Sequence, residues 1–427
     1  MATLFQAVFA GVNPAIDVID TIMSALAPAI AGWLPDGTFR AVIIDGVLAG
    51  VAGTLVFVPQ IAVLFLGIAI LEDTGYLART ALLMDRLLGR VGLPGTAFVP
   101  LLSSFACNVP GIMAARTMQS PSDRLVTILI APLMSCAARL PVYAMVTAAV
   151  FAGTPPILGF LSVGGLLITG MYLLGLLLAL IVATVLRRTI ARGPRSPLLL
   201  ELPPYRLPRW RDVVGVVGQR VWRFCRDTGT IIVALTVILW ALMSYPSTPL
   251  PPAQQATLEA AVAVATDTTS RDRASAALAS AQSAHVLEHS AAGRIGHWIE
   301  PLIAPLGFDW RIGIGLVGSF AAREVLIPVM GRVYGRGDAR TGADADSEAY
   351  QDDVGHSMVR ISHMTPLVGI ALMVFFAVAM QCMSTLAVIV RETGGWKWAL
   401  FALTYLNVLA WVLAFAARRI GLAFGLS

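Results

Sequence analysis

Long apolar runs separated by short charged segments dominate the chain. Uncharged or nearly uncharged stretches cover residues 46–71, 125–151, 157–186, 228–245, 366–390 and 398–417. A transmembrane helix needs about 20 apolar residues, and each of these stretches approaches or exceeds that length. The pattern predicts an all-α polytopic membrane protein, folded as a helical bundle.

One apolar segment cannot form a continuous helix. Residues 97–115 carry no charge, yet Pro100, Pro110 and Gly111 interrupt them, and a Cys107-Asn108 pair lies between the prolines. Irregular backbone at membrane depth is tolerated only where it is buried in protein or lines a cavity. The basic residues on both flanks suggest a hairpin that enters and leaves on one side. We interpret this segment as part of a permeation site.

A second segment resembles the first. A shift of 215 positions aligns residues 91–106 with residues 306–321, and five of the 16 pairs are identical. Chance similarity between two apolar segments remains an alternative explanation. The second copy is also interrupted, by Arg323-Glu324 and then by Pro328. The bundle is therefore expected to contain two interrupted repeat segments, 91–118 and 306–334, which is typical of transport sites.

Charge divides the rest of the chain. Residues 1–40 are predicted to form an amphipathic helix at the interface, beginning at Asn13-Pro14. Residues 41–190 form a first membrane half and 228–427 a second. Between them, 191–227 is a basic connector, cytoplasmic by the positive-inside rule, with an extended Pro-rich part. The polar loop 246–297 is expected outside the membrane, with a marginally helical Ala-rich part, and 335–353 is expected to be a solvated loop.

Composition excludes several functions. The chain has 427 residues, of which 57% are hydrophobic and 13% charged, and its net charge of +5 reports membrane topology rather than nucleic-acid binding. Its single lysine, Lys397, does not complete a phosphate-binding loop. The chain is therefore not expected to be an enzyme, and any GTP hydrolysis would need a separate polypeptide.

Polar groups inside apolar spans are candidates for function, because an unpaired polar group in hydrocarbon costs several kcal/mol. Thiol, amide and carboxylate groups together suit a divalent transition metal. The predicted metal path comprises Cys107, Asn108, Cys136, Glu324 and Cys382, and the predicted path-lining residues are Gln60, Arg139, Arg323 and Gln381. Alternatives are cysteines that only pack, a helix kinked at Pro59-Gln60, and an Arg323-Glu324 pair that is structural.

Several motifs resemble the membrane domain of the ferrous iron transporter B (FeoB) family. They are EDTGYLARTALLMDR (72–86), LPGTAFVP (93–100), CNVPGIMAART (107–117), MSCAARLPVY (134–143), ELPPYRLP (201–208), AAREV (321–325) and CMSTLAVIVRETGGWKW (382–398). The resemblance implies two Gate segments around the interrupted elements. It also implies Fe²⁺ uptake across the bacterial inner membrane, and it places the family's cysteines on Cys107, Cys136 and Cys382.

The same resemblance implies partners. Members of the family usually begin with a cytoplasmic G-protein domain, which this sequence does not show. Either a separate G-protein subunit supplies it, or the chain is a stand-alone permease with another energy source or specificity. A small accessory protein, a homo-oligomer and membrane lipid are further expected partners. Fe²⁺ is expected as transported substrate, with no permanently bound cofactor. The alternative is a Gate-fold protein that transports another divalent metal or a small solute, or a scaffold without metal transport.

Overall fold

Helices form all the regular structure that the computed structural model describes, which confirms the all-α prediction. The described residues are 2–35, 37–151, 163–191, 205–246, 248, 250–264, 268–320, 323–334, 348–362 and 364–425. Within them, six segments are long and apolar enough to cross a membrane. These are Pro14–Trp33, Thr38–Asp73, Pro121–Phe151, Val163–Thr189, Pro366–Thr393 and Trp396–Ala423. The chain is a multi-pass membrane protein.

The N-terminal helix differs from the prediction. Helix α1 (Ala2–Trp33) begins eleven residues before Asn13, and Pro14 and Pro28 lie inside it. A proline removes one backbone donor without ending a helix whose neighbouring turns are held, so Pro14 is not a start signal here. The helix packs along α3 (Ala49–Asp73). Residues Pro14–Trp33 of α1 are also long and apolar enough to span a membrane. A helix that lies at the interface does not need this length and hydropathy.

Part of the predicted connector is helical. Helix α10 (Trp210–Phe224) passes through a π-helical turn, Cys225–Gly229, into α11 (Thr230–Ser244), so residues assigned to the connector are helical. The extended stretch before α10 is fixed to the end of α3. There the backbone N–H of Arg209 donates to Asp73 Oδ2 at 2.8 Å, and Arg206 forms an ion pair with Asp73. Residues 192–204 of the connector lie outside the described part of the chain.

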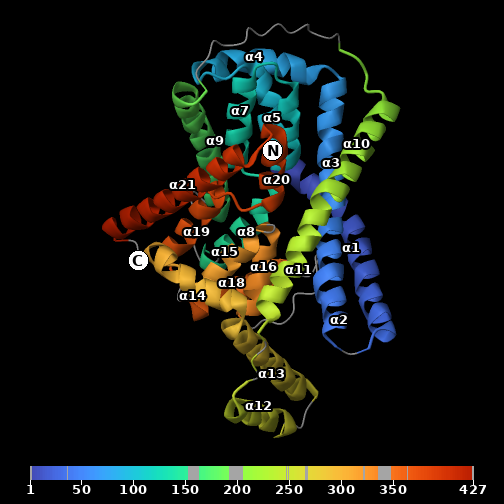
Figure 1. Ribbon diagram of the computed structural model, residues 1–427, viewed down its shortest axis with the longest axis vertical. Coiled ribbons are helices and arrows are strands. Elements are labelled where there is room, and N and C mark those ends of the chain that lie inside the picture. Colours follow the sequence, from blue (N-terminus) through green and yellow to red (C-terminus); the bar gives the residue numbers. More distant parts are fainter. Residues whose placement is uncertain are drawn as a thin grey trace.

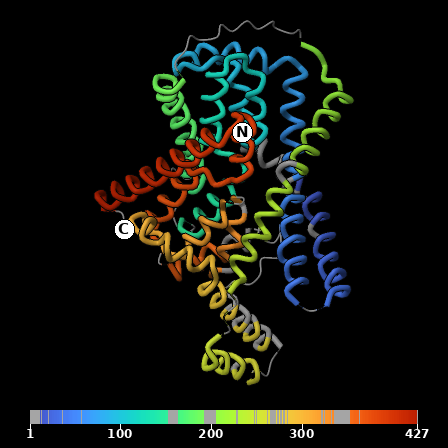
Figure 2. Tube along the Cα trace, viewed as in Figure 1, coloured from blue at the N-terminus to red at the C-terminus, as the bar shows by residue number. Residues whose placement is uncertain are grey.

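The centre of the bundle mixes both halves of the sequence (Figure 2). Helix α19 (Pro366–Val378) is buried along almost its whole length and packs against α21 (Trp396–Ala423) and α8 (Leu140–Phe151). Helix α9 (Val163–Thr189) also contacts α19, and α18 (Glu348–Ile361) packs on α8. Helices α12 (Pro252–Val264) and α13 (Thr268–His289) form a pair that projects from the bundle (Figure 1). The sequence analysis expected only a marginally helical segment here. Residues 335–347 of the predicted solvated loop lie outside the described residues.

Candidate functional site

The first interrupted segment is a helical hairpin whose turn is a single extended residue. Helix α5 (Phe98–Ala106) ends at Cys107, which has φ −155° and ψ 136°, and α6 (Asn108–Ala114) begins at the next residue. Pro100 and Pro110 lie in the first turns of the two helices, where their missing N–H groups cost nothing. The predicted interruption is therefore present, but it falls at the cysteine and not at a proline.

Close approach of the two hairpin helices depends on Gly111. A Cβ atom at this position would lie 2.0 Å from Ser104 Oγ and 2.8 Å from the carbonyl oxygen of Pro100. Backbone cannot yield as a flexible side chain can, so the hairpin tolerates only glycine here.

We therefore expect Gly111→Ala to destabilise the protein by about 1–3 kcal/mol through overpacking. The matched control is Gly53→Ala in α3, where a Cβ would meet nothing within 4 Å and the change should be neutral or slightly stabilising. Thermal unfolding of both variants in one detergent measures the difference. Equal melting temperatures for the two variants would contradict the close contact.

The second interrupted segment is also a hairpin. Helix α15 (Trp310–Ser319) and α16 (Leu326–Val333) pack together, and a short 3₁₀ turn, Arg323–Val325, precedes α16. The aligned glycines Gly92 and Gly307 both have φ +86°, so the two repeats share a left-handed turn as well as sequence. Residues 321 and 322 and the side chain of Glu324 lie outside the described part of the chain.

Two further spans are interrupted, which the sequence analysis missed. It expected residues 125–151 and 366–390 to cross as unbroken helices. In the first span, α7 (Pro121–Ile130) and a 3₁₀ turn (Ala131–Leu133) lead into extended residues that include Cys136. In the second, α19 ends at Val378, and Cys382 precedes α20 (Met383–Thr393) with φ −158° and ψ 106°. The sequences M-S-C and M-Q-C at the two breaks are the signal that could have revealed them.

Two buried arginines bind the carbonyl groups that these breaks expose. Arg139 is fully buried and donates to Pro132 O at 2.9 Å and to Ser135 Oγ at 3.2 Å. Arg323, 2% exposed, donates to Ala379 O at 3.0 Å. Helix C-termini attract positive charge, so both arginines stabilise interrupted backbone. Arg139 and Arg323 were predicted to line the metal path, and their role in capping the broken backbone is compatible with that prediction.

The four interruptions meet in the middle of the bundle. Asn108, in the amide orientation that satisfies its neighbours, donates to Ala131 O at 3.0 Å and ties the first hairpin to the first broken span. The backbone N–H of Met383 donates to Phe320 O at 3.0 Å, which joins the second hairpin to the second broken span. The turns Ala137–Arg139 and Arg323–Val325 are in contact, and α6 packs on α20. Two hairpins and two broken spans thus enclose one central region.

The predicted site residues are distributed around this region. Cys136 is 7% exposed, and Cys107 and Cys382 are half-buried. Gln381 is fully buried, and neither its Oε1 nor its Nε2 has a hydrogen-bond partner among the described residues. Gln60 is half-buried on α3. Among the described residues, no three Cys, His, Asp or Glu side chains come together as a metal site, so the metal path stays a prediction.

An ion-pair cluster at Glu392, which the sequence analysis did not identify, fixes the base of the first hairpin. The Glu392 side chain is only 1% exposed and pairs with Arg116, which follows α6, and with Arg124 of α7. Arg116 Nε lies 2.8 Å from Glu392 Oε2, and Arg124 Nη2 lies 2.9 Å from the same oxygen. The Glu392 carboxylate raises the pKa of the Arg116 guanidinium. The cluster joins the first hairpin, the first broken span and the end of the second broken span.

Paired helical hairpins and broken spans around a buried centre define a membrane transporter architecture. The chain belongs to the Gate family, described as nucleoside recognition, whose model matches residues 54–150 and 225–396. A second model, the ferrous iron transport protein B C terminus, matches residues 168–220. These matches confirm the resemblance to the ferrous iron transporter B family.

Curated relatives align with nearly the whole chain. The Fe(2+) transporter FeoB of Leptospira biflexa is 38% identical over 425 residues, which cover 100% of this chain and 57% of the relative. That of Staphylococcus aureus strain MSSA476 is 36% identical over 96% of the chain and 52% of the relative. An Fe(2+) transport protein A/Fe(2+) transporter FeoB fusion protein of Porphyromonas gingivalis is 35% identical, covering 99% of the chain and 49% of the relative. The chain spans about half the length of these relatives, and no solved structure matches it.

Proposed function

We propose that this chain is the membrane permease for ferrous iron, and that Fe²⁺ crosses where the four interruptions meet. One observation carries the proposal. Cys107, Cys136 and Cys382 each occupy a non-helical residue of a different interruption, although the sequence around them is apolar. A cysteine placed only for packing has no reason to coincide with broken backbone three times.

The chemistry of these positions suits a transported metal. Thiols beside exposed backbone carbonyls and the buried Gln381 amide offer soft and hard donors together, as a borderline divalent ion requires. We propose that Cys107, Cys136 and Cys382 bind the ion in turn, with Asn108 and Glu324 assisting. Because a conduit must also release its ion, dispersed thiols serve it better than one closed site of three ligands.

Partners and topology complete the proposal. The name of the P. gingivalis fusion protein supports a small accessory protein as partner. We further propose that GTP hydrolysis, where it drives uptake, is performed by a G-protein unit and not by the membrane helices. The site is proposed to work in the bacterial inner membrane, alone or as a homo-oligomer, with the basic connector on the cytoplasmic side and the α12–α13 pair outside.

Uptake by the purified chain in sealed lipid vesicles tests the proposal. We expect accumulation of ⁵⁵Fe²⁺ above protein-free vesicles, no accumulation of Mg²⁺, and inhibition by Zn²⁺, which binds thiol sites more tightly than Fe²⁺ does. The measurement is made with and without a separately supplied G-protein and GTP. Uptake of a nucleoside or other small solute in place of metal would contradict the iron assignment, as would absence of Fe²⁺ uptake under both conditions.

A further inference from the structure

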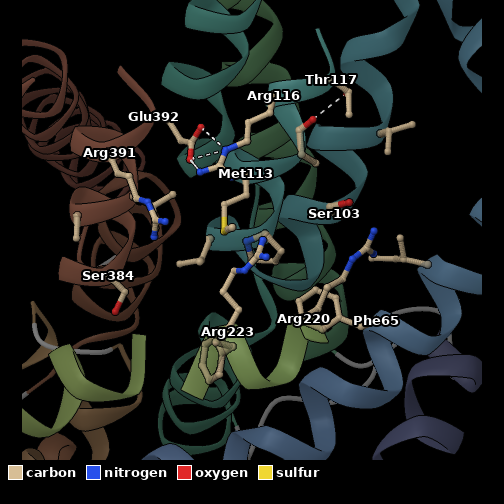
Figure 3. Close-up of a pocket in the computed structure, with 18 of the residues that line it drawn as sticks. Phe65, Ser103, Met113, Arg116, Thr117, Arg220, Arg223, Ser384, Arg391 and Glu392 are labelled. Atoms are coloured by element: carbon tan, nitrogen blue, oxygen red, sulfur yellow. Dashed lines mark hydrogen bonds and ion pairs between the residues drawn. The ribbon is translucent and has the colours of Figure 1, made fainter. Parts of the chain in front are cut away.

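A cavity of about 440 Å³ lies beside the first hairpin (Figure 3), and none of the three cysteines is among the residues that line it. Its volume falls within the range of about 300–1,000 Å³ that is typical of small-ligand sites. Helices α3, α5, α6, α10, α11 and α20 surround it. Much of the wall is apolar, formed by Phe65, Ile68, Val109, Met113, Phe224 and Ile231.

Positive charge surrounds this apolar space. Arg116, Arg220, Arg223 and Arg391 line the cavity against Glu72 and Glu392, which leaves a net charge of +2. Both carboxylates are already engaged: Glu392 by two arginines, and Glu72 by Arg220 at 3.0 Å. The net positive charge of the cavity therefore favours an anionic ligand over a cation such as Fe²⁺.

Two polar groups in the cavity have no partner among the described residues. Ser384, on α20, is 2% exposed, and its Oγ makes no hydrogen bond there. Arg223 of α10 forms no ion pair in the described structure, and Figure 3 shows it extending toward Met113 in the middle of the cavity. The Arg223 guanidinium suits an anionic oxygen ligand such as phosphate, whereas the Ser384 hydroxyl points away from it (Figure 3).

Helix α10, which carries Arg220 and Arg223, has the character of a helix at the membrane surface. On its outer side Trp210, Trp222 and Val214 are 61%, 70% and 61% exposed. Tryptophan gathers at the membrane–water interface, and basic pockets between helices on the cytoplasmic side bind anionic lipid headgroups. The basic residues and the apolar wall of the cavity thus adjoin a surface that lipid covers.

We propose that this cavity binds one anionic phospholipid, with its phosphate at Arg220 and Arg223 and the start of its acyl chains along the apolar wall. The lipid would fill the space between the first hairpin and the α3–α10 pair. It would therefore support the hairpin beside the Glu392 cluster, whose Arg116 and Glu392 also line the cavity. This binding is independent of whether the chain transports iron.

Native mass spectrometry of the whole chain tests the proposal. The protein is first placed in nanodiscs of mixed phosphatidylglycerol and phosphatidylcholine and then released, and the lipid that stays bound is identified by mass. We expect preferential retention of one phosphatidylglycerol. Arg223→Gln should weaken retention about fivefold, and Arg220→Gln with Arg223→Gln about 25-fold, at about 1 kcal/mol per charge. Arg211→Gln is the matched control, because it removes the same charge from an exposed position of α10 that does not line the cavity.

A second variant tests the apolar wall without changing charge. Ala387→Leu narrows the cavity and should also reduce retention, while melting temperatures in phosphatidylcholine alone report folding of every variant. Equal retention of both lipids by the unmodified chain would overturn the proposal. So would an effect of Arg211→Gln as large as that of Arg223→Gln, which would mark a general surface charge. Displacement of the lipid by inorganic phosphate would assign the cavity to a free anion instead.

Discussion

Replacement of Arg139 by leucine should destabilise the protein by about 2–4 kcal/mol, because it leaves buried hydrogen-bond acceptors without a donor. Arg139 has no solvent exposure and lies inside an apolar span. Its guanidinium donates to Pro132 O and Ser135 Oγ, at 2.9 and 3.2 Å. Without it, carbonyl groups of the first break would remain buried and unpaired, at about 1–3 kcal/mol each.

Unfolding of purified Arg139→Leu in detergent, followed by heat and by denaturant, measures this loss. Arg139→Lys should lie between the leucine variant and the unchanged protein, because a single ammonium cannot reproduce the guanidinium fork. The control is Arg90→Leu, an exposed arginine at the end of α4 (Tyr76–Arg90), which should shift stability by less than about 0.5 kcal/mol. Similar unfolding of the Arg139→Leu and Arg90→Leu variants would show that the break does not need its cap.

The first hairpin could be predicted from sequence because its cause is local. Two prolines and a glycine within twelve residues of an apolar segment indicate an interruption, and Gly111 at the crossing permits the close contact that a hairpin requires. The repeat was detectable because five of 16 aligned pairs are identical, and one of these pairs, Gly92 and Gly307, adopts the left-handed turn that glycine permits. These features depend on backbone geometry that neighbouring residues determine.

The two broken spans could not be predicted in this way because distant residues stabilise them. Met380 to Cys382 contains no proline or glycine, and its apolar context favours helix. The break persists because Arg323, 56 residues away, binds the carbonyl of Ala379, and because Met383 N–H reaches Phe320 O. Hydropathy therefore identified this span and its candidate residues but not its interruption.

Replacement of Cys107, Cys136 and Cys382 together by serine should reduce Fe²⁺ uptake into vesicles about tenfold or more. Serine retains nearly the volume of cysteine but offers a weaker donor to a borderline metal. If the thiols bind the ion in turn, each single variant should lose part of the uptake. Inhibition by Zn²⁺ should weaken in parallel, since Zn²⁺ competes for the same sulfur atoms.

The fourth cysteine provides the control for this experiment. Cys225 lies in the π-helical turn between α10 and α11, outside the four interruptions, and is half-buried as Cys107 and Cys382 are. Cys225→Ser should leave both uptake and its inhibition by Zn²⁺ unchanged. The triple variant must also melt near the temperature of the unchanged protein, so that lost uptake reports lost ligands. Normal Fe²⁺ uptake by a folded triple variant would mean that the thiols only pack, and the ion would then have to cross the interruptions on carbonyl, amide and carboxylate oxygens alone.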